Sequence, residues 1–313
     1  MDPNLLLWKP RGQSFVHRFQ TWLSLLDPSL LLSSDAEILK AREALPAAGQ
    51  QLDEKVPPAE ILSLSSVHAD SGAVLPFVFR PPAYFPVLGP LVVGGFLPHP
   101  TVGSTLVFQS MLQIYSASFS FANRNSSAEQ KASLKQLLLI AGSAFNTAVG
   151  GALPHIFIIR LGVSSPTLQT FCRSFLPVPL QAALAALNVF IVRSEETETG
   201  IRVFDSEGNP VGFSKAAAEK AVRETAQSRA VLFGTTAAAP HLVAALLYRT
   251  RLLQRRPLLA GPCHYISTAL VLGLMVPLSF SLFPQLGSIT RGKLEAELRA
   301  EAAGEEFYFH RGL

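Results

Sequence analysis

The sequence predicts an all-α integral membrane protein: a bundle of about five transmembrane helices, with an aqueous, amphipathic N-terminal region and a small β-hairpin plus helix in one loop. Of its 313 residues, 49% are hydrophobic and 15% are charged, whereas soluble domains typically carry about 25% charged residues. The mean hydropathy is +0.31. No Asp or Glu occurs in 71–128, 130–194 or 225–294, although a soluble fold would place acids on every exposed face.

Five runs without charge are long enough to cross a bilayer, because about 20 apolar residues span roughly 30 Å of hydrocarbon. They are 81–123, 136–159, 174–192, 230–248 and 257–290. The first has room for two helices, yet the Pro and Gly residues before the break at 98–100 equally fit a bent or re-entrant piece. We therefore predict five spans and a sixth, doubtful segment. A soluble helical protein with a large core is the alternative, which hydropathy over such long windows disfavours.

Residues 1–80 are polar enough to form an aqueous region of amphipathic helices. The first predicted helix ends near Asp27 and has one apolar face, formed by Phe15, Phe19, Trp22, Leu23 and Leu26. Ser34 and Glu37 have the spacing of a capping box that opens a second helix. Either the two helices pack on each other, or the apolar face lies on the membrane surface or on the end of the bundle. The mixture of acids predicts no cleavable targeting segment.

The predicted bundle, 81–290, is interrupted by a polar loop at 193–229. Residues 201–213 predict two short strands around a turn, and the loop motif comprises Asp205, Gly208, Asn209 and Gly212. Ser214 is positioned to cap a helix whose wet face carries Glu219 and Arg223. This helix is expected to run directly into the span that begins near Ala230. Residues 291–313 form a C-terminal tail.

Neither metal binding nor enzyme chemistry is predicted. Cys172 and Cys263 do not lie in a CxxC, and no two histidines stand three or four residues apart, so we expect no metal site and no cofactor. No GxSxG, Walker, GxGxxG or HExxH motif supports an enzyme. The net charge of +4 is modest, and no basic stripe interleaved with aromatics indicates nucleic acid.

Polar side chains within the predicted spans are the candidates for a solute path. They are Gln113, Ser116, Ser120, Asn146, Gln181 and Asn188. A polar group surrounded by lipid needs partners, so these side chains must face the interior of the bundle. They form either interhelical hydrogen bonds or a path for a small neutral or zwitterionic solute. Because the spans lack Asp and Glu, coupling to cations or protons through carboxylates is disfavoured.

Six short stretches give the chain a resemblance to a known family. They are "LLDPSLLL" (25–32), "HADSG" (68–72), "FANRN" (121–125), "DSEGNPVGFSKAAAEKA" (205–221), "LFPQ" (282–285) and "FYFHRGL" (307–313). In order and spacing they resemble the sideroflexins, multi-span proteins of the mitochondrial inner membrane, over nearly the whole chain. "WKPRGQSFVHRFQTWLSLLDP", "VRETAQSRAVLFGT" and "GLMVPLSFSLFPQ" look most like the divergent sideroflexin-4 branch.

The chain departs from the family pattern in two places. The usual signature before the first apolar segment is His-Pro-Asp-Thr-Gly-Glu, and its positions here are held by His68, Asp70, Ser71 and Gly72 among others. Ala69, Ser71 and Ala73 replace the proline, the threonine and the glutamate, so the turn has lost its stiffening proline. The segment ending in Asn-Arg matches at Asn123 and Arg124, but serines 116 and 120 stand where the family commonly has asparagines. Serine offers fewer hydrogen bonds than asparagine, so we expect poor handling of the usual family substrate.

The resemblance implies transport of small neutral amino acids, serine foremost, across the mitochondrial inner membrane. For the sideroflexin-4 branch it implies instead a link to assembly of respiratory complex I, with its membrane subunits or assembly factors as partners, and an indirect link to iron homeostasis. With five spans embedded in the lipid bilayer, the basic loop 249–256 shares a side with the N-terminus and the C-terminus lies on the other side. Arg124 or Arg193 near the span ends is expected to attract a solute carboxylate.

Overall fold

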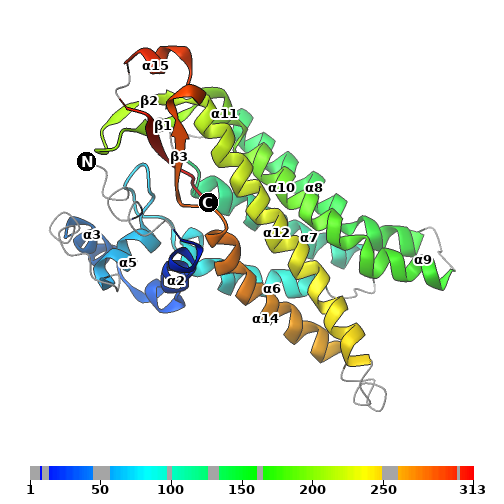
Figure 1. Cartoon of the computed structure of the whole chain (residues 1–313). Helices are drawn as coiled ribbons and strands as arrows, with labels where there is room; N and C mark the ends of the chain where they lie inside the picture. The colour runs from blue at the N-terminus through cyan, green and yellow to red at the C-terminus, as the bar shows by residue number, and fades with distance from the viewer. Residues whose placement is uncertain are drawn as a thin grey trace.

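The computed structural model describes residues 8, 14–44, 57–96, 101–125, 134–160, 165–248, 260–301 and 304–313. Within these ranges the chain is mostly helical, with a four-stranded antiparallel sheet at one end of a helical bundle (Figure 1). The prediction of a helical bundle is confirmed, and the sheet is larger than the predicted hairpin.

The N-terminal region packs on the end of the bundle. Its helices are α2 (Phe15–Leu25), α3 (Asp35–Glu43) and α5 (Pro58–Ser66), and the predicted capping box of Ser34 and Glu37 opens α3. Helix α2 rests on α14 (Ala260–Ser281): the Trp22 ring meets Phe280 edge-on with centroids 4.9 Å apart, and the Arg18 Nε donates to the Ser281 carbonyl at 2.8 Å. Only part of the predicted apolar face lies on the bundle: Trp22 is buried there, whereas Phe15 and Leu23 are exposed. The buried residues of α2 are Arg18, Thr21, Trp22 and Leu25.

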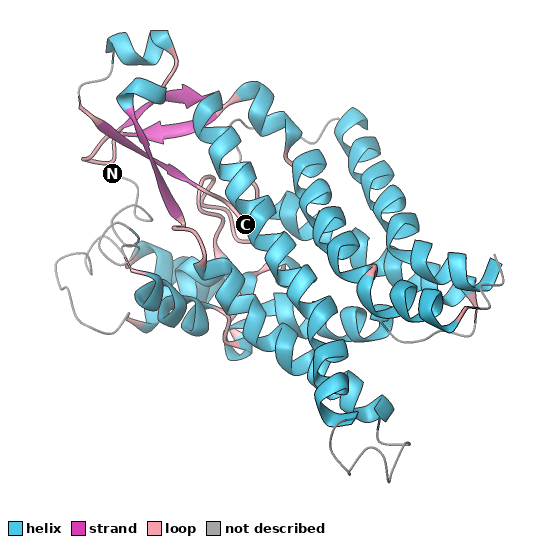
Figure 2. Ribbon diagram, turned by 45° about the vertical axis from the view of Figure 1, so that its right-hand side comes forward, coloured by secondary structure: helices cyan, strands magenta, loops and turns pink. Residues whose placement is uncertain are grey.

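The bundle itself consists of antiparallel helix pairs. They are α6 (Tyr84–Phe96) with α7 (Val102–Ala122), α8 (Leu134–Arg160) with α10 (Pro177–Val192), and α12 (Lys215–Tyr248) with α14. Helix α9 (Pro166–Thr170) and the π-helical turn η4 (Phe171–Phe175) lie between α8 and α10. Helix α10 also packs on α12, α7 on α8, and α14 on α6, which closes the three pairs into one bundle (Figure 2).

Two helical segments meet the length and hydropathy expected of membrane spans, Leu137–Ile158 and Gly261–Ser281, and Pro177–Val192 is apolar but shorter. Large apolar side chains are also exposed along α7, α8 and α14, among them Ile114, Phe145 and Leu270. The chain therefore has transmembrane character, but the described residues do not confirm five spans. The doubtful segment forms α6, whose 13 residues reach about 20 Å and are too short to cross the hydrocarbon unaided.

Both ends of the described chain lie at the same end of the bundle, unlike the arrangement expected for five spans. The Leu313 N–H donates to the carbonyl of Asn123, at the end of α7, at 3.1 Å. The Trp8 ring lies 5.8 Å from that of Trp22 and belongs to one apolar core with Leu313. Each antiparallel pair of helices returns the chain to the end of the bundle from which it started (Figure 1). The basic loop 249–256 lies outside the described residues, but the helices that flank it end at the opposite end of the bundle (Figure 1).

The sheet has the order β2-β1-β4-β3. Strands β1 (Ile201–Phe204) and β2 (Pro210–Ser214) form the predicted hairpin, while β3 (Leu286–Thr290) and β4 (Glu306–His310) come from the C-terminal part of the chain. Residues 286–290 were predicted to end the last uncharged span, and the structure corrects this because α14 ends at Ser281. The two apolar side chains of this strand, Leu286 and Ile289, are buried in the cores beneath the sheet.

The predicted turn and helix cap in the loop are confirmed. Asp205 accepts hydrogen bonds from the backbone N–H groups of Glu207 and Asn209 at 2.9 and 2.8 Å, and Gly208 has a φ of +84°. This geometry favours glycine, which lacks the Cβ that disfavours positive φ. Ser214 Oγ accepts from the Ala217 N–H at 3.1 Å and so caps α12, which continues without a break into its apolar half. At Gly212 an added Cβ would collide with Leu298 of α15 (Ala296–Glu301).

Candidate functional site

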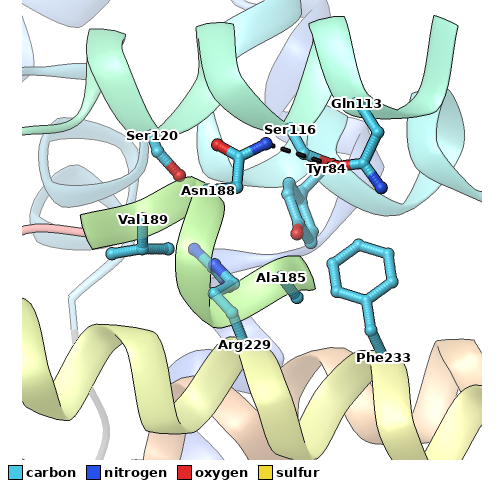
Figure 3. Close-up of a pocket in the computed structure, with 9 residues that line it drawn as sticks. All are labelled: Tyr84, Gln113, Ser116, Ser120, Ala185, Asn188, Val189, Arg229 and Phe233. Atoms are coloured by element: carbon cyan, nitrogen blue, oxygen red, sulfur yellow. Dashed lines mark hydrogen bonds between the residues drawn. The ribbon is translucent and has the colours of Figure 1, made fainter. Parts of the chain in front are cut away.

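A pocket lies inside the bundle between α6, α7, α10 and α12, and we call it the helix pocket. Its cavity volume is about 10 Å³, no more than a single water molecule needs, so the side chains that line it nearly fill it. The lining residues are Tyr84, Gln113, Ser116, Ser120, Ala185, Asn188, Val189, Arg229 and Phe233. Figure 3 shows the α7 and α10 side chains facing Arg229 and Phe233 of α12 across this space. The described lining residues include one cationic group and no carboxylate.

The polar atoms of the helix pocket are only partly used by the protein. Asn188 Nδ2 donates to Gln113 Oε1 at 3.2 Å (Figure 3). Three further buried atoms have no hydrogen-bond partner among the described residues: Asn188 Oδ1, Ser116 Oγ and Arg229 Nη1. A buried polar group without a partner typically costs about 1–3 kcal/mol. The pocket thus presents an unused acceptor, a hydroxyl and a cationic donor in one small volume.

Arg229 is held by aromatic rings instead of by a carboxylate. Its guanidinium carbon lies 4.4 Å from the centroid of Phe280, 5.0 Å from that of Tyr84 and 5.7 Å from that of Phe119. The side chain is buried, with 3% of its surface exposed. Contacts of this kind attract a cation through the ring quadrupole, but they do not neutralise its charge. The site is therefore suited to an anionic group of a solute.

The structure brings together four of the six residues predicted for the solute path. Gln113, Ser116, Ser120 and Asn188 line the helix pocket. Gln181 is buried nearer the far end of the bundle, where an added Cβ on Gly151 would meet both Gln181 and Gln109. Asn146 does not join them, because its side chain is exposed on α8.

Sequence reasoning missed Arg229. Arg229 is the last charged residue of α12 before the apolar half of the helix, so its position in the sequence is typical of a residue at the aqueous edge of a span. The signal available was its position three or four residues beyond the buried Thr225 and Ala226, which places it on the inward face of the helix.

The signature residues form a tight loop joined to the end of α7. His68 Nε2 makes a 2.6 Å hydrogen bond with the carbonyl oxygen of Arg124, and His68 Nδ1 accepts from the N–H groups of Asp70 and Ser71 at 3.3 and 3.1 Å. This pattern fixes the neutral tautomer with the proton on Nε2. Burial lowers the pKa of His68, against the opposing effects of its hydrogen bond and of Asp70. Gly72 closes the loop with a φ of +70°.

Asn123 and Arg124 join the α7 end to its surroundings. Asn123 Nδ2 donates to the carbonyls of Phe79 and Phe119 at 2.9 and 3.0 Å. The Arg124 guanidinium stacks 4.1 Å from the ring centroid of Phe121, and Arg124 Nη1 lies 3.4 Å from a carboxylate oxygen of Glu195. Arg124 therefore keeps its charge close to the aqueous end of the bundle.

A second pocket, which we call the motif pocket, lies beside this loop and has a cavity volume of about 40 Å³. It is lined by Trp8, Trp22, Leu64, Val67, His68, Ala69, Leu75, Pro81, Asn123, Arg124, Asn125, Gln285, Gly312 and Leu313. Four of the stretches that suggested a family thus meet at one place, although they are far apart in the sequence.

Comparison with known proteins identifies the family that these stretches suggested. The family model for sideroflexins matches residues 7–313. The chain belongs to the sideroflexin family. A sideroflexin-4 of Danio rerio is 50% identical and aligns over the whole of both chains. A sideroflexin-4 of Homo sapiens is 35% identical over all of this chain and 93% of the relative, and a sideroflexin-5 of Rattus norvegicus is 32% identical over 99% and 93%. No solved structure matches the chain.

This sideroflexin has a layer of buried hydrogen bonds between the two pockets. Arg193 forms a two-pronged ion pair with Glu196, with nitrogen–oxygen distances of 2.6 and 2.7 Å, and also donates to Thr225 Oγ1 at 3.0 Å. Its side chain is 0% exposed and that of Glu196 is 3% exposed. Arg193, predicted to attract a solute carboxylate, is thus occupied by an internal carboxylate.

The sideroflexin's described residues contain no group of three His, Cys, Asp or Glu side chains arranged to hold a metal ion. Cys172 and Cys263 are free. Two histidines from different helices do face each other: the rings of His241 on α12 and His264 on α14 have centroids 5.5 Å apart. Sequence spacing within single helices cannot reveal such a pair.

Proposed function

We propose that the protein carries a small zwitterionic amino acid across the mitochondrial inner membrane. The observation that supports this is the set of three unpartnered polar atoms in the helix pocket, on Arg229, Asn188 and Ser116. The sideroflexins are a family of carrier-like membrane proteins, and the mitochondrial location is what the resemblance of the whole chain to that family implies.

The chemistry of these atoms matches the groups of an amino acid. Arg229 Nη1 is a charged donor suited to the carboxylate. Asn188 Oδ1 is an acceptor suited to the ammonium group, and Ser116 Oγ can donate to or accept from a side-chain hydroxyl. A solute that satisfies all three removes the penalty of leaving them unpaired. Serine fits this class because it offers a carboxylate, an ammonium group and a hydroxyl.

The lining also argues against cation-driven transport. Sodium and other hard cations need oxygen ligands, most of them carboxylates or carbonyls, and the described lining residues include no Asp or Glu. A fixed guanidinium repels a cation further. We therefore propose facilitated movement down the gradient of the amino acid, without coupling to an ion through this pocket.

The second candidate is a non-transporting role in assembly of respiratory complex I, with an indirect effect on iron homeostasis. The serines at positions 116 and 120 favour it, because family members commonly carry asparagine there and this chain has fewer hydrogen bonds to offer. Large apolar side chains exposed on α7 and α8, such as Met111 and Phe157, would then contact complex I membrane subunits or assembly factors as well as lipid.

Uptake of labelled serine by reconstituted liposomes separates the two functions. Asn188→Ala removes the amide that faces the helix pocket, whereas Asn146→Ala removes an exposed amide from α8 and is the matched control. Arg229→Gln removes the cationic donor. Hydrogen bonds to charged groups are worth about 1.5–3 kcal/mol, so we expect Arg229→Gln to lower uptake at low serine by about 10- to 150-fold and Asn146→Ala to leave it unchanged.

The result that rejects transport is uptake by the unmodified protein no higher than that of empty vesicles. Cells lacking the protein provide the other arm. If the unmodified protein restores complex I in these cells but shows no uptake in liposomes, the second candidate is supported. If uptake is present and Arg229→Gln abolishes it but still restores complex I, assembly does not depend on the helix pocket.

A further inference from the structure

The motif pocket and the helix pocket are separated by one helical turn on three different helices. On each helix a residue lining the helix pocket stands three or four positions from a residue of the buried hydrogen-bond layer. These pairs are Ser120 and Asn123 on α7, Val189 and Arg193 on α10, and Arg229 and Thr225 on α12. Because one turn rises about 5.4 Å, the layer is a thin partition across the bundle.

The last residues of the chain complete this partition. Arg193 Nη2 donates to the carbonyl of Arg311 at 2.8 Å, and Asn125 Nδ2 donates to the carbonyl of His310 at 2.8 Å. The Leu313 N–H bonds to the carbonyl of Asn123 at 3.1 Å. The C-terminal segment 310–313 is thus hydrogen-bonded to the ends of α7 and α10 at the level of the partition.

Gly312 fits at the centre of the partition because it has no side chain. Its φ is +71°, and an added Cβ would lie 3.0 Å from Arg193 Nη2 and 3.0 Å from the Asn123 carbonyl oxygen. The segment fills the space fully, and it is also held by Arg311, which is buried and donates to the Phe280 carbonyl at 3.1 Å, and by Leu313, which lies in the apolar core with Trp8. Displacing it breaks these contacts, but none of them is a backbone hydrogen bond within a helix. It is therefore a part of the partition that can leave without unwinding a helix.

The motif pocket on the outer side is suited to receive an anionic group. Arg124 lines it, His68 Nδ1 accepts from N–H groups and burial lowers the pKa of His68, and its described lining residues include no Asp or Glu. Arg124 is shared with Glu195, which lies outside the lining at 3.4 Å, and a cationic group in the wall attracts a carboxylate from solution. A solute entering from this side would meet Arg124 first and Arg229 beyond the partition.

We propose that the motif pocket is the aqueous vestibule of the solute path and that the C-terminal segment 310–313 is the gate between it and the helix pocket. This inference rests on the proposed function. It also gives a reason for the convergence of the family stretches, since the signature loop, the α7 end, Gln285 and the C-terminal residues all belong to the vestibule or the gate.

Cysteine accessibility tests the gate without relying on transport. The full-length protein, with Cys172 and Cys263 replaced by serine, is placed in lipid nanodiscs so that both faces meet the reagent, a membrane-impermeant thiol reagent carrying a sulfonate. The reporter is Ser120→Cys in the helix pocket. The gate is weakened in two separate ways: by ending the chain at Arg311, and by Gly312→Ala, which keeps its length.

We expect Ser120→Cys to react slowly behind the intact gate and about tenfold faster or more when the gate is weakened, because one or two hydrogen bonds of ordinary strength are lost. Phe213→Cys on the exposed face of β2 should react in every background. Ala144→Cys is the control for general loosening, since Ala144 is buried between helices but lines neither pocket.

Equal reaction of Ser120→Cys with intact and weakened gates would overturn the proposal. So would a parallel rise at Ala144→Cys, because the whole bundle would then have loosened. Serine uptake is scored separately on the unmodified protein. Absence of uptake rejects the proposed function, whereas labelling that does not depend on the C-terminal segment rejects the gate alone.

Discussion

Replacing Glu196 by alanine is expected to be among the most destabilising single changes in the chain. Its carboxylate forms two hydrogen bonds of 2.6 and 2.7 Å with Arg193 and accepts a third from Asn125 Nδ2 at 3.2 Å. After the change, the Arg193 guanidinium keeps its bonds to Thr225 and to the Arg311 carbonyl but loses its counter-charge. Because the side chain is completely buried, water cannot take the place of the carboxylate.

The size of the effect follows from this burial. Removing one partner of a buried ion pair typically costs about 3–5 kcal/mol, because an uncompensated charge stays in the interior. Glu196→Gln also removes the counter-charge, but it retains the shape of the side chain and one acceptor oxygen for Arg193, so its cost should be smaller than that of Glu196→Ala. Glu195→Ala is the matched control: Glu195 is the preceding residue, its side chain is 36% exposed, and exposed pairs contribute about 0–1 kcal/mol.

Thermal unfolding of the purified protein in detergent, followed by reaction of a fluorogenic dye with Cys172 and Cys263, measures the order of stability. We expect the unmodified protein and Glu195→Ala to have nearly equal melting temperatures. The melting temperature of Glu196→Gln should be lower, and that of Glu196→Ala should be the lowest. If Glu196→Ala melted together with Glu195→Ala, the buried pair would not stabilise the fold and the reasoning would be refuted.

Two further predictions concern charges outside the membrane. Asp70→Ala should lower the steady-state amount of inserted protein, because Asp70 lies 3.8 Å from Arg202 of β1 and connects the signature loop to the sheet; normal abundance with lost complex I would instead indicate a partner contact. Burial raises the pKa of Glu224 above its ordinary 4.5, against the opposing charges of Lys220 and Arg311. The folded state therefore favours the protonated acid, and this stabilisation is complete below pH 4.5 and lost as the pH rises through the raised pKa. Between pH 4.5 and neutrality, the melting temperature of Glu224→Gln should thus rise relative to that of the unmodified protein. A difference between the two melting temperatures that did not change with pH would contradict the raised pKa of Glu224.

Local patterns in the sequence predicted local structure well. The capping box at Ser34, the turn at Gly208 and the cap at Ser214 each depend on a few adjacent residues, and all three are present. Four of the nine residues that line the helix pocket could be predicted for a similar reason. Residues 113, 116 and 120 of α7 are spaced so that they share one face of a helix. Because polar side chains in a lipid environment must face the interior of the bundle, that face could be predicted to point inward.

The features that were missed depend on contacts between distant parts of the chain. Residues 286–290 are apolar enough to resemble the end of a span, and only their pairing with β4 shows that they form a strand. Arg229 looked like a charge at a span boundary, and its role depends on rings from α6, α7 and α14. The count of spans was uncertain for another reason: α6 is apolar but short, so hydropathy alone does not determine on which side the chain ends.

The strand order of the sheet has a consequence for how the protein is made. Strand β4, the last of the four strands to be synthesised, lies between β1 and β3 in the order β2-β1-β4-β3. The β1–β2 hairpin must therefore wait, with one edge uncovered, while the residues up to 306 are synthesised. Pairings between segments so far apart in sequence form slowly, and exposed strand edges invite wrong partners. Folding of the sheet can be completed only after β4 has left the ribosome, so a ribosome that stalls before β4 leaves a chain with helices but without a closed sheet.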